Sequence, residues 1–436
     1  MKKLMIVLLI ASLLTSLLTG CFDRREVDEL AYVMAIGFDK GKTNILKITF
    51  QIAIPKGMGG GGGEEGGGGG GGDKNSMVLS IEAPTLYSAI NMANTTVSRQ
   101  LNTSHAKAVV FSKEMAQQGI DRYIHTLIRS REFRPNMYMV VSRTSAEEFI
   151  KSVQPKLEGN PAKYYELTLN SYNYTAFIGN TQLINFYNAA SAFYSNPVAT
   201  LGGVNAFKSS KDFNLNDSTY TEKREKYPQE GDFRAGGITK YGELKTEFMG
   251  LAVFDGTKMV GELDGQETSY YLMATGQYNY AYWSIPDPKV EGYFILLNVK
   301  QSRKPERKVQ MVDGKPNIHL KIRLEADILN IQSGVNYEDL KQLPVLEKSA
   351  EDYIKQGLQD MLNKTSKQYH TDICGFGAEE KRKFLTWEEW EKFNWLSRYK
   401  DSTFNVDVDL KVRRPGLLIR TIPSPTSEGN MEVQNQ

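Results

Sequence analysis

Apolar and polar positions alternate over residues 29–54, and this period of two predicts a β-hairpin. Its turn would be formed by the polar stretch DKGK at residues 39–42. The same alternation recurs in two places further along the chain. Residues 248–255 and 259–263 flank an Asp-Gly pair and predict a second hairpin, and residues 404–412 predict a late strand.

Between the two hairpins the pattern changes to helices alternating with short strands. Apolar spacing predicts helices beginning near Pro84 and Ile120, and paired Thr/Ser and Glu residues at 144–148 form capping boxes for a third. A long amphipathic helix is predicted over residues 345–368. The order of elements indicates an α/β or α+β chain with mixed sheets and helices.

A glycine-rich tract, residues 57–72, contains 13 glycines and interrupts the strand pattern. A Gly-rich loop can hold a phosphate group when it joins a strand to a helix. Here no GK[ST] sequence follows and the tract is long and uniform. We therefore predict a flexible insert between two strands rather than a nucleotide site.

The first twenty residues have the pattern of an export signal. Two lysines follow Met1, an apolar stretch runs to Leu18, and the sequence LTGC ends at Cys21. This ending matches the bacterial lipobox, which predicts cleavage between Gly20 and Cys21 and a diacylglycerol on the Cys21 sulfur. The alternatives are an ordinary cleaved signal with a chance cysteine and an uncleaved anchor.

The charge, hydropathy and cysteine content of the chain restrict the classes of protein to which it can belong. The 53 Lys and Arg residues nearly balance 51 Asp and Glu residues, so we expect no nucleic-acid partner. Mean hydropathy is −0.42, and no later apolar stretch is long enough to span a bilayer. The two cysteines, Cys21 and Cys374, could form at most one disulfide, and acylation of Cys21 would leave Cys374 as a lone structural thiol.

No catalytic or metal-binding pattern emerges from the residues. The four histidines, at 105, 125, 319 and 370, lack the spacing of metal ligands, and no GxSxG nucleophile elbow is present. Carboxylates are abundant, but no pair stands out as an acid/base dyad. We therefore expect no cofactor and a binding or assembly role rather than an enzyme.

Four sequence blocks resemble the C subunits of spore germinant receptors. These blocks are residues 20–39 (GCFDRREVDELAYVMAIGFD), 104–111 (SHAKAVVF) continuing through Gly119-Ile120, 248–263 with Glu267, and 372–377 (DICGFG) followed by Trp390, Trp395 and residues 404–410. Their order and spacing agree with the family over residues 1–414. Phe22 stands where a Trp is common in the family, and the glycine tract is an unusual insertion.

The resemblance implies three mixed α/β domains in an extended arrangement. Together with the sequence pattern it predicts a signal peptide (1–20), an N-terminal domain (21–200), a middle strand-rich domain (201–300), a C-terminal domain (301–414) and a disordered tail (415–436). The implied function is non-enzymatic: a lipoprotein on the outer face of the spore inner membrane. It would act with A and B membrane subunits in nutrient-triggered germination.

The charged stretch directly after the predicted anchor is a candidate contact with the membrane or with partner subunits. It consists of Phe22, Asp23, Arg24, Arg25 and Glu26. A solvated spacer is the alternative interpretation of the same residues.

Two other classes share the lipobox. The solute-binding lipoprotein of an importer would show two doubly wound lobes around a cleft, which the strand-rich later segments fit poorly. A lipid-anchored hydrolase would need a catalytic constellation, which the sequence does not show.

Overall fold

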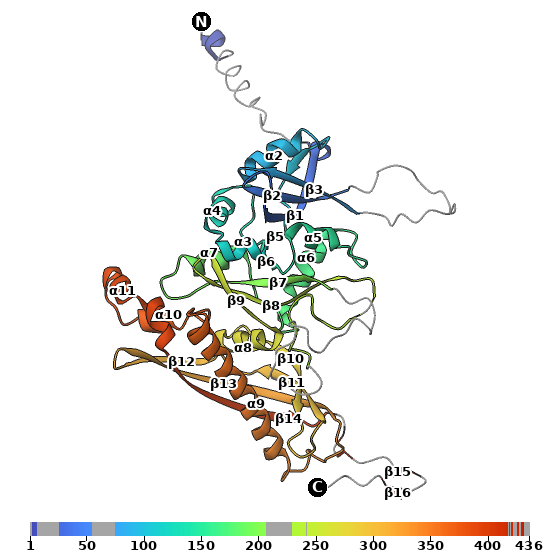
Figure 1. The fold of residues 1–436 in the computed structure, drawn as a ribbon, viewed down its shortest axis with the longest axis vertical. Helices are drawn as coiled ribbons and strands as arrows, with labels where there is room; N and C mark the ends of the chain where they lie inside the picture. The colour runs from blue at the N-terminus through green and yellow to red at the C-terminus, as the bar shows by residue number, and fades with distance from the viewer. Residues whose placement is uncertain are drawn as a thin grey trace.

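The computed structural model shows an α+β protein whose strands gather into two principal sheets, one above the other along the long axis (Figure 1). It describes residues 2–6, 26–54, 75–205, 229–240, 242–416, 418, 420–421, 425–426 and 429–430. The mixed sheets and helices confirm the predicted fold class. In these ranges no helix is both long enough and apolar enough to cross a bilayer.

The first sheet has the strand order β3-β2-β1-β5-β6-β7-β8-β9, with the short β4 beside β1. Strands β1, β5, β6 and β7 are parallel, and antiparallel strands extend the sheet at both ends. The strands are β1 (Leu30–Lys40), β2 (Leu46–Ala53), β3 (Ser76–Ala83), β4 (Gln100–Asn102), β5 (Ala108–Ser112), β6 (Tyr138–Ser142), β7 (Val198–Val204), β8 (Thr246–Asp255) and β9 (Lys258–Leu263).

Both predicted hairpins are confirmed. Strands β1 and β2 pair antiparallel, and so do β8 and β9 around the Asp255-Gly256 turn. Strand β2 also pairs with β3, so the glycine tract joins two neighbouring strands, as the pattern predicts. The tract itself lies outside the described residues, and the prediction of its flexibility stays a prediction.

Helices cover both faces of the first sheet, because its central strands are apolar on both sides. In β5, Val109 and Phe111 pack in one core with α2, α3, α4 and α7, while Ala108 and Val110 pack in the opposite core with α5 and α6. The helical elements are η1 (Val27–Glu29), α2 (Leu86–Asn94), α3 (Lys113–Gln118), α4 (Asp121–Arg129), α5 (Ala146–Ser152), α6 (Pro161–Leu169), η2 (Asn170–Asn173) and α7 (Leu183–Ala190).

The second sheet is centred on one long strand, β13. Its first part pairs with β12 and its second part with β11, while β14 runs parallel along its other edge. Alternating burial along β13 gives it one covered face, which the long helix α9 helps to cover. The strands are β10 (Tyr280–Pro286), β11 (Phe294–Gln301), β12 (Glu306–Val312), β13 (Lys315–Ile331) and β14 (Thr403–Arg414).

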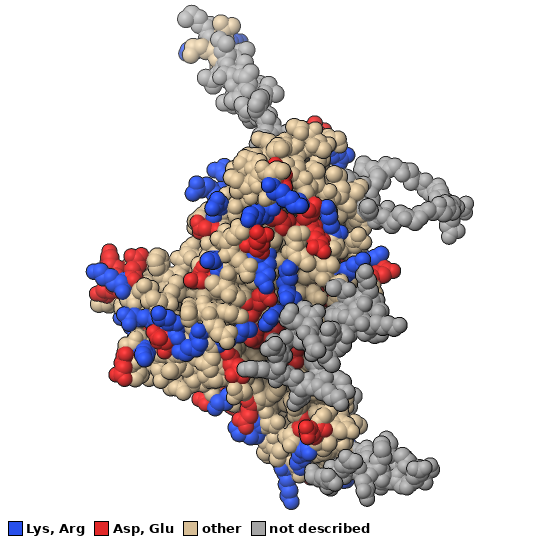
Figure 2. All heavy atoms as spheres, viewed as in Figure 1, with Lys and Arg blue, Asp and Glu red and all other residues tan. Residues whose placement is uncertain are grey.

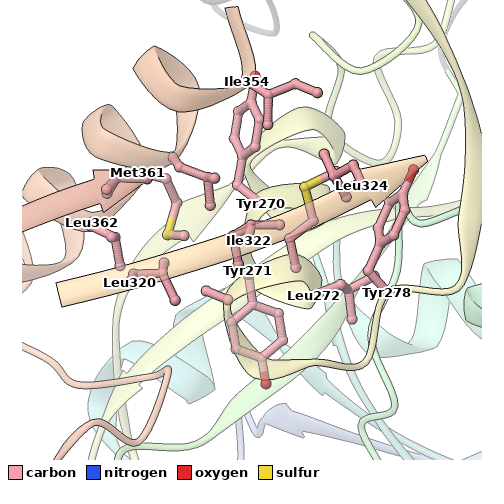
Figure 3. Packing of buried hydrophobic residues seen from close by; sticks show 14 of the residues in the cluster. Tyr270, Tyr271, Leu272, Tyr278, Leu320, Ile322, Leu324, Ile354, Met361 and Leu362 are labelled. Carbon is pink, nitrogen blue, oxygen red and sulfur yellow. The ribbon is translucent and has the colours of Figure 1, made fainter. Parts of the chain in front are cut away.

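Helix α8 lies in a core that both sheets share (Figure 3). Its Tyr270, Tyr271 and Leu272 are buried among β13 and α9, and Leu263 at the end of the first sheet belongs to the same core. The remaining elements are α8 (Gly265–Thr275), α9 (Leu343–Asn363), η4 (Lys364–Gln368), α10 (Gly377–Lys381), α11 (Trp387–Phe393), α12 (Trp395–Arg398), η5 (Tyr399–Asp401), β15 (Pro425–Thr426) and β16 (Gly429–Asn430).

The sheets do not divide at the predicted domain boundaries. The first sheet continues past residue 200 to Leu263, and β10 and β11 join the second sheet before residue 301. The three-domain division stays a prediction. Much of the tail after Pro415 lies outside the described residues, and so does the signal peptide apart from residues 2–6.

Candidate functional sites at the N-terminal end and between the sheets

The predicted anchor stretch is only partly visible. Gly20, Cys21 and residues 22–25 lie outside the described residues, so lipid attachment and the proposed contacts of Phe22, Asp23, Arg24 and Arg25 stay predictions. Glu26 is described and exposed, and its carbonyl accepts a hydrogen bond from the Glu29 amide at 3.2 Å. The chain enters β1 directly afterwards, at Leu30.

The short helical turn η1, which precedes β1, lies beside the C-terminal end of α2. A shallow groove there has a volume of ≈ 630 Å³, and charges of both signs line it. Its lining residues are Asp28, Glu29, Asn94, Val97, Ser98, Arg99 and Gln100. The end of the molecule nearest the predicted anchor is therefore built by η1, α2 and β4.

The AIGFD sequence of β1 has a structural role. The Asp39 carboxylate accepts hydrogen bonds from the Ala146 and Glu147 amides at 2.8 and 2.9 Å, so it caps the start of α5. At Gly37, a Cβ atom would lie 2.8 Å from Ile150 Cδ1. Glycine at 37 lets α5 pack closely on the sheet, and Asp39 caps the N-terminus of that helix.

An ion-pair group supports the same helix. Glu147 contacts Lys47 of β2 and Lys151 of α5, and Ser80 of β3 donates to it at 3.0 Å. Desolvation raises the pKa of Glu147, but these hydrogen bonds outweigh it and hold the pKa at about 2. The group ties β2, β3 and α5 together.

A buried carboxylate lies among basic side chains at the carboxyl ends of the parallel strands. Lys113 and Arg143 directly follow β5 and β6, and both face Glu262 of β9, at 2.7 and 3.6 Å. Arg234 approaches the same carboxylate at 3.9 Å. Ligands of open α/β sheets often bind at such strand ends. Here the chain's own Glu262 neutralises the site.

The first joint between the two sheets lies around the VGEL sequence of β9. A Cβ atom at Gly261 would lie 2.2 Å from the ring of Tyr369, so the ring needs a residue without a side chain at this position. The Tyr369 hydroxyl donates to the Glu262 carbonyl at 3.0 Å. The ammonium group of Lys364, at the start of η4, donates to both carboxylate oxygens of Glu267, each at 2.7 Å.

Asp264 places Glu267 for this joint. Its carboxylate accepts from the Glu267 amide at 2.8 Å, and the Glu267 carboxylate accepts from the Asp264 amide at 3.0 Å, which completes a capping box. Burial and the neighbouring Glu267 charge raise the pKa of Asp264 to about 7. The N-terminus of α8 is therefore held by a buried carboxyl group.

A second joint uses the DICGFG block. The backbones of Asn196 and Asp372 are linked, and Asn196 Oδ1 accepts from the Asp372 amide at 3.0 Å. The Asp372 carboxylate, whose pKa burial raises, accepts from the Gly377 amide and from Trp395 Nε1, both at 2.9 Å. A Cβ atom at Gly377 would lie 2.5 Å from the Trp395 ring. The segment before β7 is thereby bound to the C-terminal helices.

The remaining side chains that could take part in a reaction, Cys374 and His105, are packed against other parts of the fold. Cys374 is buried, burial raises the pKa of its thiol, and its carbonyl accepts from Arg307 at 2.9 Å. His105 packs edge-on against Tyr32, and desolvation lowers its pKa. Among the residues that the structure describes, no group of three or more His, Cys, Asp or Glu side chains could hold a metal ion.

Two family models match most of the chain. One, described as the spore germination protein N-terminal domain, matches residues 23–202; the other, described as spore germination B3/GerAC like, C-terminal, matches residues 249–416. The chain belongs to the family of spore germinant receptor C subunits. This membership confirms the resemblance found in the four blocks and assigns the chain to spore germination.

Similar proteins cover the chain almost from end to end. Spore germination protein KC of Bacillus subtilis (strain 168) is 27% identical over 95% of this chain and 96% of its own length. Spore germination protein GerQC of Bacillus cereus is 21% identical over 93% of this chain and 97% of its own. The crystal structure of the GerBC protein is 15% identical, with a TM-score of 0.47, over 86% of this chain and 96% of that chain.

Sequence reasoning missed the partners that complete the joints of this germination protein. The resemblance pointed to Gly261, Glu267 and Asp372, but not to Tyr369, Lys364 or Asn196. Tyr369 and the residue it bonds are 107 positions apart, and no local pattern signals such a pairing.

Proposed function

We propose that the chain is a lipid-anchored, non-enzymatic C subunit of a nutrient germinant receptor. It would be held on the outer face of the spore inner membrane by a diacylglycerol on Cys21. There it would act with the A and B membrane subunits. The alternative of a solute-binding lipoprotein loses support, because the two large sheets of the described residues are one mixed sheet and one mainly antiparallel sheet instead of two doubly wound lobes.

The observation that carries this proposal is the register of the family match behind the lipobox. The N-terminal family model begins at residue 23, two positions after Cys21, and the C-terminal model follows in the family's order. Family membership supports an association with the spore inner membrane. Two acyl chains, at about 0.8 kcal/mol for each buried CH₂, would make the attachment durable.

The roles of the family's motif residues support an assembly function. Gly37 and Asp39 seat α5, Gly261 and Glu267 join the two sheets, and Asp372 binds the C-terminal helices. These polar and acidic side chains fix the relative position of elements. This use fits a protein that presents surfaces to partners.

The test is to replace Cys21 by Ala in the spore-forming host and to follow both location and germination. We expect the variant to leave the membrane fraction and nutrient-triggered germination to slow, because the acyl anchor is lost. Cys374→Ala is the matched control, since it removes the other cysteine at a buried position distant in sequence. A Cys21→Ala variant that stays in the membrane fraction and germinates normally would contradict the proposal.

A further inference from the structure

Helix α2 presents an uncharged face at the anchor-proximal end of the molecule. Its nine residues, LYSAINMAN, include no charged side chain. Leu86, Ala89, Ile90 and Ala93 are buried against the sheet, whereas Tyr87 and Met92 are 44% and 47% exposed. In Figure 2 the surface at this end is mostly uncharged, with charged side chains of both signs at its margin. The outward face of α2 therefore combines Tyr87 and Met92 with the uncharged polar side chain of Asn91.

Basic side chains flank this face on the side of α4. Arg122, His125 and Arg129 line a groove of ≈ 480 Å³ with Tyr87, Thr126 and Ser130. The Tyr87 hydroxyl donates to Ser130 Oγ at 2.7 Å, which fixes α2 beside the end of α4. Both arginines are exposed, and the one acidic neighbour on α4, Asp121, lies 3.6 Å from His125. The groove therefore combines guanidinium groups with an aromatic ring.

The predicted anchor brings this surface close to the bilayer. Glu26 lies five positions after Cys21, which limits the distance between them to roughly 18 Å even when the chain is fully extended. The next residues, Asp28 and Glu29, lie beside the C-terminal end of α2. A nine-residue helix is about 14 Å long. The whole of α2 is therefore within reach of the surface to which Cys21 would be attached.

We propose that the outward face of α2, with Arg122 and Arg129 of α4, docks on an anionic lipid bilayer. This proposal rests on the lipid anchor of the proposed function. Tyr87 and Met92 would lie at the boundary between headgroups and acyl chains, where amphipathic aromatic rings are favoured. The guanidinium groups of Arg122 and Arg129 would bind lipid phosphates. The acidic Asp28 and Glu29 lie at the other end of α2, so the attraction is strongest at the Tyr87 end.

The experiment uses the acylated full-length protein in vesicles and a fluorophore on a single introduced cysteine. Met92→Cys reports the proposed surface, and Leu385→Cys, at a 95% exposed position in the C-terminal half, is the matched control. Cys374 is buried and Cys21 is acylated, so neither should take the label. In phosphatidylcholine vesicles containing phosphatidylglycerol, we expect position 92 to be shielded from an aqueous quencher and position 385 to stay accessible.

The arginines are tested by a double substitution. Arg122→Gln with Arg129→Gln should restore quenching at position 92, and it should weaken binding of the unacylated chain to the same vesicles by roughly 30-fold. Lys308→Gln with Lys315→Gln, at exposed positions of the second sheet, is the charge-matched control and should change neither readout.

The outcomes separate this proposal from the proposed function. A chain that fails to float with vesicles would contradict the lipid anchor and the docking surface together. A chain that floats, but whose position 92 is as accessible as position 385, would overturn the docking surface alone. Shielding that appears only in native spore membranes would also overturn it, and would assign the face to a protein partner.

Discussion

Replacing Asp264 by Asn should change how the stability of the protein depends on pH. Asp264 is 4% exposed, and its pKa in the folded protein is raised from 3.8 to about 7 by burial and by Glu267. Asn accepts the hydrogen bond from the Glu267 amide as well as Asp does, and it is an equally good helix cap. The substitution therefore removes the ionisation while it keeps the cap.

The sign of the effect follows from the two pKa values. Below pH ~4 Asp264 is protonated in both folded and unfolded chains and has no pH-dependent effect. As pH rises from ~4 to ~7, the unfolded chain ionises and the folded chain does not, so the free energy of unfolding falls. Each pH unit corresponds to about 1.4 kcal/mol, and the whole interval amounts to about 4 kcal/mol.

Urea unfolding followed by tryptophan fluorescence measures this difference. We expect the free energy of unfolding of the wild type, relative to Asp264→Asn, to fall by about 4 kcal/mol between pH ~4 and ~7 and to stay constant above. Thr85→Asn changes the N-cap of α2 without removing a titrating group, so its difference from the wild type should not vary with pH. A pH-independent difference for Asp264→Asn, or one that grows in the opposite direction, would refute the reasoning.

Asp39→Ala should lower the free energy of unfolding by about 2 kcal/mol, because two amides at the start of α5 lose their acceptor, whereas Asp39→Asn should lose less; equal stability of Asp39→Ala and wild type in urea titrations would contradict this role. Gly261→Ala should destabilise by about 1–3 kcal/mol, because the new Cβ collides with the Tyr369 ring. The same substitution in a Tyr369→Ala background should cost much less, and additive effects in this double-mutant cycle would exclude the contact.

Local patterns predicted the elements whose apolar residues recur regularly between clear turn signals. The hairpins at 30–53 and 246–263 are bounded by such turns, although β1 and β8 are buried along almost their whole length. The long helix α9 has one covered face, so its apolar spacing shows in the sequence. Strand β12 was missed because Val309 is its one buried residue. The helical spacing of Leu86, Ile90, Ala93, Val97 and Leu101 predicts a helix that continues from Pro84 to Leu101, but α2 ends at Asn94 and Leu101 belongs to β4.

Some of the candidate sites are also visible in the local sequence, whereas others depend on the folded structure. The lipobox at Cys21 is a local sequence signal and needs no fold. The docking surface needs α2 and α4 to lie side by side, and the position of Arg129 beside Tyr87 depends on the folded sheet. The joints likewise depend on contacts between residues far apart in the chain, such as Lys364 with Glu267. The resemblance identified one side of each joint, and the folded structure supplies the other.

The core around α8 explains why motif residues from both halves of the chain would serve one function. Tyr270 packs so closely on Gly357 of α9 that a Cβ atom there would lie 2.1 Å from the ring. Leu263 and Val198 of the first sheet belong to the same buried cluster as Ile322 of β13. Together with the two joints, this shared core holds the two sheets in one position relative to each other. We therefore expect a contact at the α2 end to fix the position of the second sheet as well. An anchor at Cys21 would then hold the exposed surfaces of the second sheet at a fixed height above the bilayer, where membrane subunits could bind them.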